Sequence, residues 1–218
     1  MMKQLIRIPV LTIIGLTLLV SCKKDEATIN TKPCSNEYFY YATADSKIYL
    51  TQSSSEMWIV FEQEEVSKEL AESILNKYAF IANINVTANN YHQMGVRIDE
   101  STADCAVVNG YLKVLNEDDE IFSATPVFYL NDDDPDSYYI LLSEVVTKND
   151  EDLISEADFI DYAESLNLEL IEAKYSRQHF RVKDVKTGFE ALEIANQIFE
   201  SGKAQYANPN CIMKIELY

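Results

Sequence analysis

The sequence predicts an α+β protein made of two tandem ferredoxin-like (βαββαβ) units preceded by an N-terminal β-hairpin. Two observations support this prediction. Residues 191–210 read ALEIANQIFESGKAQYANPN, the pattern of a helix, a turn and a strand, and residues 108–127 repeat it more weakly. In addition, hydrophobic periodicity predicts the order strand, helix, strand, strand, helix, strand twice along the chain. We therefore expect a duplicated fold.

The start of the chain resembles an export signal that is removed. Lys3 and Arg7 make a basic beginning, and the apolar run over residues 8–18 is too short for a stable membrane span. Cys22 follows Leu-Val-Ser, a pattern similar to the lipobox in which a cysteine takes a diacylglycerol. We expect a lipoprotein signal peptide over residues 1–21 and lipidation of Cys22. An ordinary secretory signal with an incidental cysteine is the alternative.

Residues 22–36 are polar and are predicted to be the lipidated cysteine and a flexible tether. Lys23, rather than an aspartate, follows the cysteine and argues against retention in the inner membrane. The run CKKDE also resembles the surface-export signal of Bacteroidota-type lipoproteins. The sequence thus predicts an outer membrane lipoprotein held by its lipid anchor. Surface exposure is expected, and the periplasmic leaflet stays open as the alternative.

The chain is strongly acidic, with a formal net charge of −18. Loss of Lys3 and Arg7 with the signal lowers this value to −20 in the mature chain. Such a surface repels nucleic acid and anionic lipid head groups, so we expect no nucleic-acid partner and membrane contact only through Cys22.

Three cysteines remain after Cys22, namely Cys34, Cys105 and Cys211. An odd number excludes a complete disulfide framework but allows one pair in an oxidising compartment. Small, buried apolar residues are the other interpretation, and the sequence favours it. Zinc is not expected, because the chain has no CxxC motif and no histidine near these cysteines.

Residues 37–130 are predicted to contain the hairpin and the first unit. An aromatic run, a turn and an alternating stretch within residues 37–51 indicate the hairpin. Apolar residues then recur at every fourth position, as on one face of a helix, and Ser101 with Asp104 resembles a capping box for a second helix. The expected strands of this unit are residues 57–61, 80–86, 94–98 and 121–130.

Residues 131–136 read NDDDPD and are predicted to be an acidic linker between the units. Asp132, Asp134 and Asp136 have the alternate spacing of a calcium-binding loop. However, the glycine expected at the sixth position of such a loop is missing. The three aspartates are therefore only a weak calcium candidate, and a solvated linker is favoured.

Residues 137–218 are predicted to form the second unit. Ser155 with Asp158 marks the start of its first helix, and Thr187 with Glu190 forms a capping box for its second helix. The expected strands are residues 138–146, 168–171, 179–182 and 212–217.

The sequence predicts no catalytic site. The two histidines, His92 and His179, lie near corresponding turns of the two units, which indicates topology rather than chemistry. The motifs GxSxG and HExxH, the phosphate-binding loop and the dinucleotide fingerprint are all missing from the sequence. We therefore expect a protein that is not an enzyme and that has no cofactor.

Residues 191–210 resemble the end of a fervidolysin-type N-terminal prodomain, the propeptide of certain secreted subtilisin-like serine proteases. In that family the segment reads approximately A-L-E-x-A-N, an aromatic residue, E-S-G, and then Y-A-x-P-N/D. The hairpin around Tyr40 and Tyr41 and the strand at residues 58–61 also resemble the start of that prodomain. Cys211 departs from the family, which usually has an aromatic residue at this position.

The resemblance implies a propeptide-like protein that binds a subtilisin-like serine protease in trans and inhibits it or assists its folding. The protease domain that follows the prodomain in the family is missing from this sequence, so no catalytic residue carries over. In such a complex the tail would enter the protease cleft, although the same residues could simply end the last strand. A surface lipoprotein that captures another ligand or mediates adhesion, with no protease partner, is the alternative function. The tail residues are Ile215, Glu216, Leu217 and Tyr218.

Overall fold

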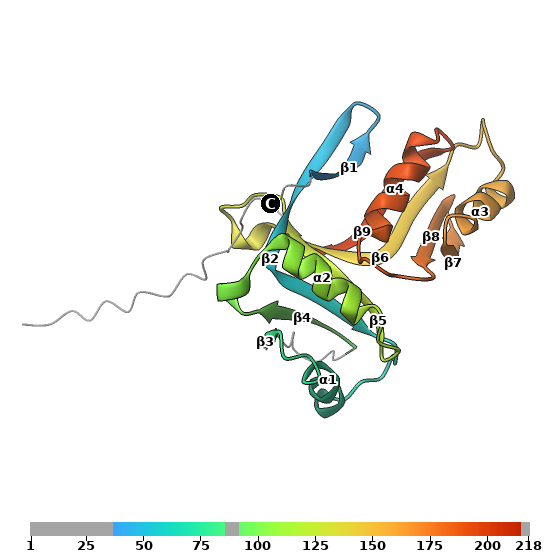
Figure 1. Ribbon diagram of the computed structural model, residues 1–218. Coiled ribbons are helices and arrows are strands. Elements are labelled where there is room, and N and C mark those ends of the chain that lie inside the picture. Colours follow the sequence, from blue (N-terminus) through green and yellow to red (C-terminus); the bar gives the residue numbers. More distant parts are fainter. Residues whose placement is uncertain (1–36, 86–91, 215–218) are drawn as a thin grey trace, which may run out of the picture.

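The computed structural model of the protein describes residues 37–85 and 92–214 (Figure 1). The first half of this described part contains strands β1 (Tyr38–Thr43), β2 (Ser46–Phe61), β3 (Ile81–Asn85), β4 (Gln93–Ile98) and β5 (Ile121–Tyr129), with helices α1 (Lys68–Leu75) and α2 (Cys105–Leu115). The second half contains strands β6 (Tyr138–Asn149), β7 (Leu168–Lys174), β8 (Arg177–Val182) and β9 (Ala204–Met213), with helices α3 (Glu156–Glu164) and α4 (Glu190–Glu200). Two short 3₁₀ turns lie at Glu100–Thr102 and Pro135–Ser137.

All of these strands belong to one antiparallel nine-stranded sheet. The order along the sheet is β3-β4-β2-β5-β6-β8-β7, with β1 paired to β2 and β9 paired to β6. The prediction of two tandem ferredoxin-like βαββαβ units is therefore wrong. The pairing of β5 with β6 overturns it, because Val127 lies opposite Ile140 and Tyr129 lies opposite Tyr138 in one continuous ladder. Periodicity identifies strands but does not reveal that the last strand of one repeat pairs with the first strand of the next.

The helices cover one face of the sheet and enclose the main hydrophobic core (Figure 1). Helix α2 packs on β2 and β5, whereas α4 packs on β6 and β9. The alternation of side chains along β6 explains this one-sided packing, because every second residue from Tyr139 to Asn149 is buried against the helices. Phe159 of α3 and Phe180 of β8 are fully buried in the same core. The core is thus continuous across both halves of the sheet.

The helix starts agree only in part with the sequence. The hydroxyl of Ser155 accepts from the backbone N–H of Asp158, which confirms the predicted cap of α3. Helix α2 instead uses Asp104 as its N-cap, and Ser101 lies in the preceding 3₁₀ turn. At α4 the carboxylate of Glu190 accepts from the backbone N–H groups of the loop before it, and the N-cap position itself is Phe189.

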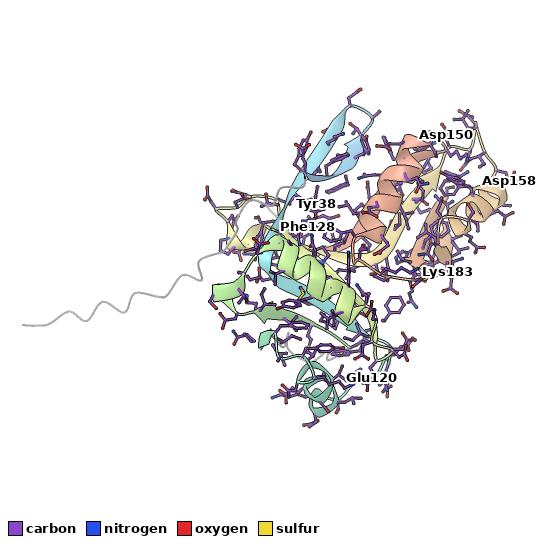
Figure 2. The ribbon with its side chains drawn as sticks, viewed as in Figure 1. Tyr38, Glu120, Phe128, Asp150, Asp158 and Lys183 are labelled. Atoms are coloured by element: carbon purple, nitrogen blue, oxygen red, sulfur yellow. The ribbon has the colours of Figure 1, made fainter. Side chains whose placement is uncertain are left out.

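The N-terminal hairpin, formed by β1 and the first residues of β2, lies against the second half of the chain. Tyr38 stacks on Phe189 with ring centroids 5.0 Å apart, and it meets Phe128 edge to face at 5.3 Å (Figure 2). Tyr40 stacks on Tyr139 at 5.5 Å. Because β2 continues from this hairpin into the first half, where it pairs with β4 and β5, it ties both halves together.

The loop between β8 and α4 crosses closely over β5. Gly188 has a φ of +82°, and a Cβ atom at this position would lie 2.4 Å from the carbonyl oxygen of Ala124. Beside it, the hydroxyl of Thr125 donates to the carbonyl of Leu141 at 2.5 Å. These contacts add to the β5–β6 ladder and join the two halves where the described strands meet.

Candidate functional site

The face of the sheet opposite the helices, here called the helix-free face, carries a second apolar cluster. Trp58 of β2, Val127 and Tyr129 of β5 are buried in it, and Trp58 is only 6% exposed although no described helix packs on this face. Side chains of the neighbouring strands cover these three residues. The partly buried members of the cluster are Val60, Tyr138, Ile140, Leu142 and Ile212.

A cleft of about 570 Å³ opens next to this cluster on the helix-free face. Residues of β2, β4 and β5 line one side of it, and residues of β6, β7 and β8 line the other. Lys183, labelled in Figure 2, lies directly after β8. The polar lining consists of Glu62, Glu64, His92, Gln93, Ser123, Ser143, Glu144, Glu169, Arg181 and Lys183.

A β-bulge shapes one wall of the cleft. In the pairing of β2 with β5, Val60 lies opposite Ser123 and Phe61 lies opposite Ile121, so Phe122 is the extra residue. A bulge re-aims side chains, and both Phe122 and Ser123 line the cleft. The guanidinium carbon of Arg181 lies 5.2 Å from the centre of the Phe122 ring, a cation–π contact between β8 and β5.

The hydroxyl of Ser123 is buried and has no hydrogen-bond partner among the described residues. A buried polar group without a partner costs about 1–3 kcal/mol of folding free energy. Native proteins rarely retain such a group without a reason, such as a bound water, an ion or a ligand. Ser123 therefore marks the floor of the cleft as a place where a hydrogen-bonding partner is expected.

Glu144 and His179 form a polar cluster beside the cleft. Oε2 of Glu144 lies 2.8 Å from Nε2 of His179 and accepts from the side-chain amide of Asn210 at 2.7 Å. A carboxylate that orients a histidine is one part of a nucleophilic site. Within the described residues, however, no hydroxyl or thiol bonds to this histidine. The arrangement orients side chains on β6, β8 and β9 without completing a catalytic triad.

A second polar network holds β2, β4 and β5 together on the same face. Oε1 of Glu56 accepts from Nε of Arg97 at 2.8 Å, and Oε2 of Glu56 accepts from the hydroxyl of Tyr129 at 2.5 Å. Burial and the hydrogen bond to Glu56 raise the pKa of Tyr129 well above its ordinary value. The phenol consequently stays protonated and continues to donate to the carboxylate.

Several predicted site residues lie outside the described residues, namely Cys22 and the tail residues Ile215, Glu216, Leu217 and Tyr218. The weak calcium candidates Asp132, Asp134 and Asp136 lie in the connection from β5 to β6. The carboxylate of Asp134 accepts from the backbone N–H of Asp136, and Asp136 pairs with Lys214. Within residues 37–85 and 92–214, no three His, Cys, Asp or Glu side chains gather as metal ligands would.

The two histidines make different contacts in the structure. Nδ1 of His92, before β4, lies 2.8 Å from the carbonyl oxygen of Gln63, whereas His179 pairs with Glu144 on β8.

The favoured interpretation of the cysteines as unpaired, buried apolar residues is wrong for Cys105. Cys105, at the start of α2, is disulfide-bonded, whereas Cys211 of β9 is a free thiol. Burial raises the pKa of the Cys211 thiol, which lowers its reactivity at neutral pH. Among the described helices, none is long and apolar enough to cross a membrane.

Sequence reasoning did not predict the cleft. Its walls come from six strands that are distant in sequence, and Ser123, Phe122 and Arg181 carry no local motif. One signal was present, since Arg181 and Glu144 lie on strands that the periodicity identified. Their juxtaposition depends on the register of β6 with β8, which the sequence does not specify.

The comparisons with known proteins leave the family of this chain open. No protein-family model matches it, and the comparison with curated proteins gives no match. The resemblance of residues 191–210 to a protease prodomain therefore stays a prediction.

Proposed function

We propose that this chain is a non-catalytic, propeptide-like lipoprotein of the outer membrane, anchored through Cys22. Its partner is a subtilisin-like serine protease, which it binds in trans and inhibits or helps to fold. The proposal combines the resemblance of residues 191–210 and of the N-terminal hairpin to a protease prodomain with one structural observation.

The observation that carries the proposal is that these two stretches contact each other. Tyr41 of β1 stacks on Phe199 of α4 with ring centroids 4.7 Å apart, and its hydroxyl donates to Glu200 at 2.8 Å. The side-chain amide of Asn196 donates to the carbonyl of Phe39 at 2.8 Å. Residues more than 150 positions apart thus form one cluster. Because the resemblance falls on residues that pack together, it supports a shared structural unit.

The position of β9 supports a role for the tail that follows it. Among the described strands, β9 is paired in the sheet only with β6, and Cys211 to Met213 are partly exposed. An extended segment that continues such a strand can add backbone hydrogen bonds to a partner while alternate side chains fill its pockets. We propose that Leu217 and Tyr218 enter the protease cleft in this way, with Tyr218 in the first specificity pocket.

Titration of subtilisin-like proteases from the source organism tests this function. The ligands are the mature chain without its lipid, residues 23–218, and the same protein lacking residues 216–218. We expect inhibition by the first protein and its loss in the second, with unchanged circular dichroism and melting temperature as the folding control. Absence of binding by both proteins at micromolar concentration would rule out the inhibitor function.

A second candidate function is ligand capture at the cell surface with no protease partner. The cleft favours it, because a polar cavity with a buried, unpartnered hydroxyl has the character of a binding site. Two outcomes of the titration would favour this candidate. Either the protease still binds after the tail is removed, or it does not bind at all.

A further inference from the structure

The cleft on the helix-free face arises from the way the sheet divides. Strand β9 pairs along one edge of β6, so β5 and β8 share the other edge. Strand β5 pairs with β6 at residues 138–140, and β8 pairs with it at residues 144–147. The free end of β5 and the facing end of β8 bound the cleft, whose volume of about 570 Å³ lies in the range of small-molecule sites.

Ser123 offers a hydrogen bond in this cleft that the protein itself does not use. Its Oγ is buried and lacks a partner among the described residues, and the bulge at Phe122 aims this side of β5 into the cleft. A hydroxyl can both donate and accept, so a ligand carboxylate or amide would satisfy it.

Arg181 offers a second group. It lies in one row across the sheet with Glu144 and Glu169, its register partners on β6 and β7. Neither carboxylate forms an ion pair with it, since Oε2 of Glu144 is bonded to His179 and Asn210. Its side-chain contact within the described residues is the ring of Phe122, which orients the guanidinium and leaves its N–H groups free. A planar guanidinium with free donors binds a carboxylate in two parallel hydrogen bonds.

Carboxylates, whose charge is opposite to that of Arg181, lie along the same cleft. Glu62, Glu64 and Glu169 line it and make no ion pair or side-chain hydrogen bond with a described residue. Unpaired groups of both signs in one cavity favour a ligand that carries both signs, because each charged group then finds a complement.

We propose that this cleft binds a small ligand with an α-carboxylate and an ammonium group, that is, a free amino acid or a short peptide. Arg181 and Ser123 hold the carboxylate, and the glutamates, Glu62 and Glu64 foremost, hold the ammonium group. The bulge residue Phe122 fixes Arg181 for this contact. Binding here does not require the tail or a protease, so this site and the proposed protease function succeed or fail separately.

Trp58 provides the signal for a direct test. It is the one tryptophan of the chain, and its indole N–H donates to Gln93, which lines the cleft. The mature chain, in detergent, is titrated with glycine, L-alanine, L-lysine, Ala-Ala and Ala-Ala-Ala while tryptophan fluorescence and heat are recorded. N-acetyl-alanine and alanine amide, each lacking one of the two charges, are the ligand controls. The relative affinities of amino acids and peptides identify which of the two sources the cleft takes.

We expect saturable binding of at least one zwitterion and roughly tenfold or greater weakening when either charge is removed from it. Arg181→Gln is expected to weaken binding by a similar factor, and Ser123→Ala by a smaller one. The matched control is Arg177→Gln, since Arg177 lies on the same strand outside the cleft. The proposal is overturned if no zwitterion binds at millimolar concentration, if the charge-deleted ligands bind equally well, or if Arg181→Gln binds like the control.

Discussion

Gly188 lies where the loop before α4 crosses β5, and the close approach of the two backbones there requires a residue without a side chain. Its φ of +82° lies in the left-handed region, and a Cβ atom would overlap the carbonyl oxygen of Ala124. Gly188→Ala is therefore expected to lower the free energy of unfolding by at least about 2 kcal/mol, from backbone strain and steric overlap together. Chemical denaturation measures this change.

Gly202 provides the matched control for that substitution. It has a similar φ of +71°, but a Cβ atom there would meet nothing within 4 Å. Gly202→Ala should cost only the backbone term, about 1 kcal/mol. Equal losses at the two glycines would show that the close approach to Ala124 contributes nothing.

At the scale of single residues, the sequence predicted caps better than contacts. Ser155 was identified because a hydroxyl three positions before an acidic residue is a local pattern. The closeness of Gly188 to β5 has no such pattern, since the two segments lie more than 60 positions apart. The same reason kept Ser123 and Arg181 out of any prediction.

Among the described strands, β1 pairs with β2 alone, yet three of its tyrosines stack on aromatic rings of the second half. The aromatic run was predicted as part of the N-terminal hairpin. Its packing on α4 was not predicted, because the partner helix lies at the other end of the chain.

Tyr41→Ala tests whether β1 is held by these side chains. The substitution removes the stack on Phe199 and the hydrogen bond to Glu200, so we expect it to lower the free energy of unfolding by more than the control substitution does. Tyr49→Ala on the other strand of the hairpin is the control. Tyr49 is 55% exposed, and its replacement should change stability by less than about 0.5 kcal/mol. A larger effect at Tyr49 than at Tyr41 would contradict this account.

For the whole molecule, the order of strands and helices after the hairpin was predicted, but the second hairpin strand and the strand expected at residues 57–61 are one strand, β2. The assembly of the strands was not predicted. Periodicity and turn residues act over a few positions, whereas the β5–β6 ladder is set by register and by apolar side chains on both strands. The helix-free face illustrates the same limit, since Trp58 and Val127 become neighbours only when β2 and β5 pair.

The cysteines supply a test at this scale. Cys105 is disulfide-bonded and Cys211 is free, while Cys22 is the predicted lipidation residue, so we expect Cys34 to be the partner of Cys105. A bond closing a loop of about 70 residues contributes about 4 kcal/mol in the chain-entropy account, so Cys105→Ser should lower stability by that order.

Peptide mapping by mass spectrometry without reduction checks the pairing, and denaturation of Cys105→Ser beside Cys211→Ser checks the energy. Cys211→Ser should leave the disulfide in place and change stability much less. A Cys22 peptide linked to Cys105 would refute both the pairing and the lipid anchor.

The contact between β1 and α4 also has a consequence for how the chain folds while it is being synthesised. The hairpin emerges first, but its packing partners Phe199 and Glu200 lie near the end of the sequence. Contacts of such high sequence separation form late and slow the folding rate. The aromatic strand therefore remains without its packing partners while the rest of the chain is synthesised, and its exposed rings favour aggregation during this period. The interval before α4 is made is thus a stage at which this chain is open to misfolding, whatever the stability of the finished fold.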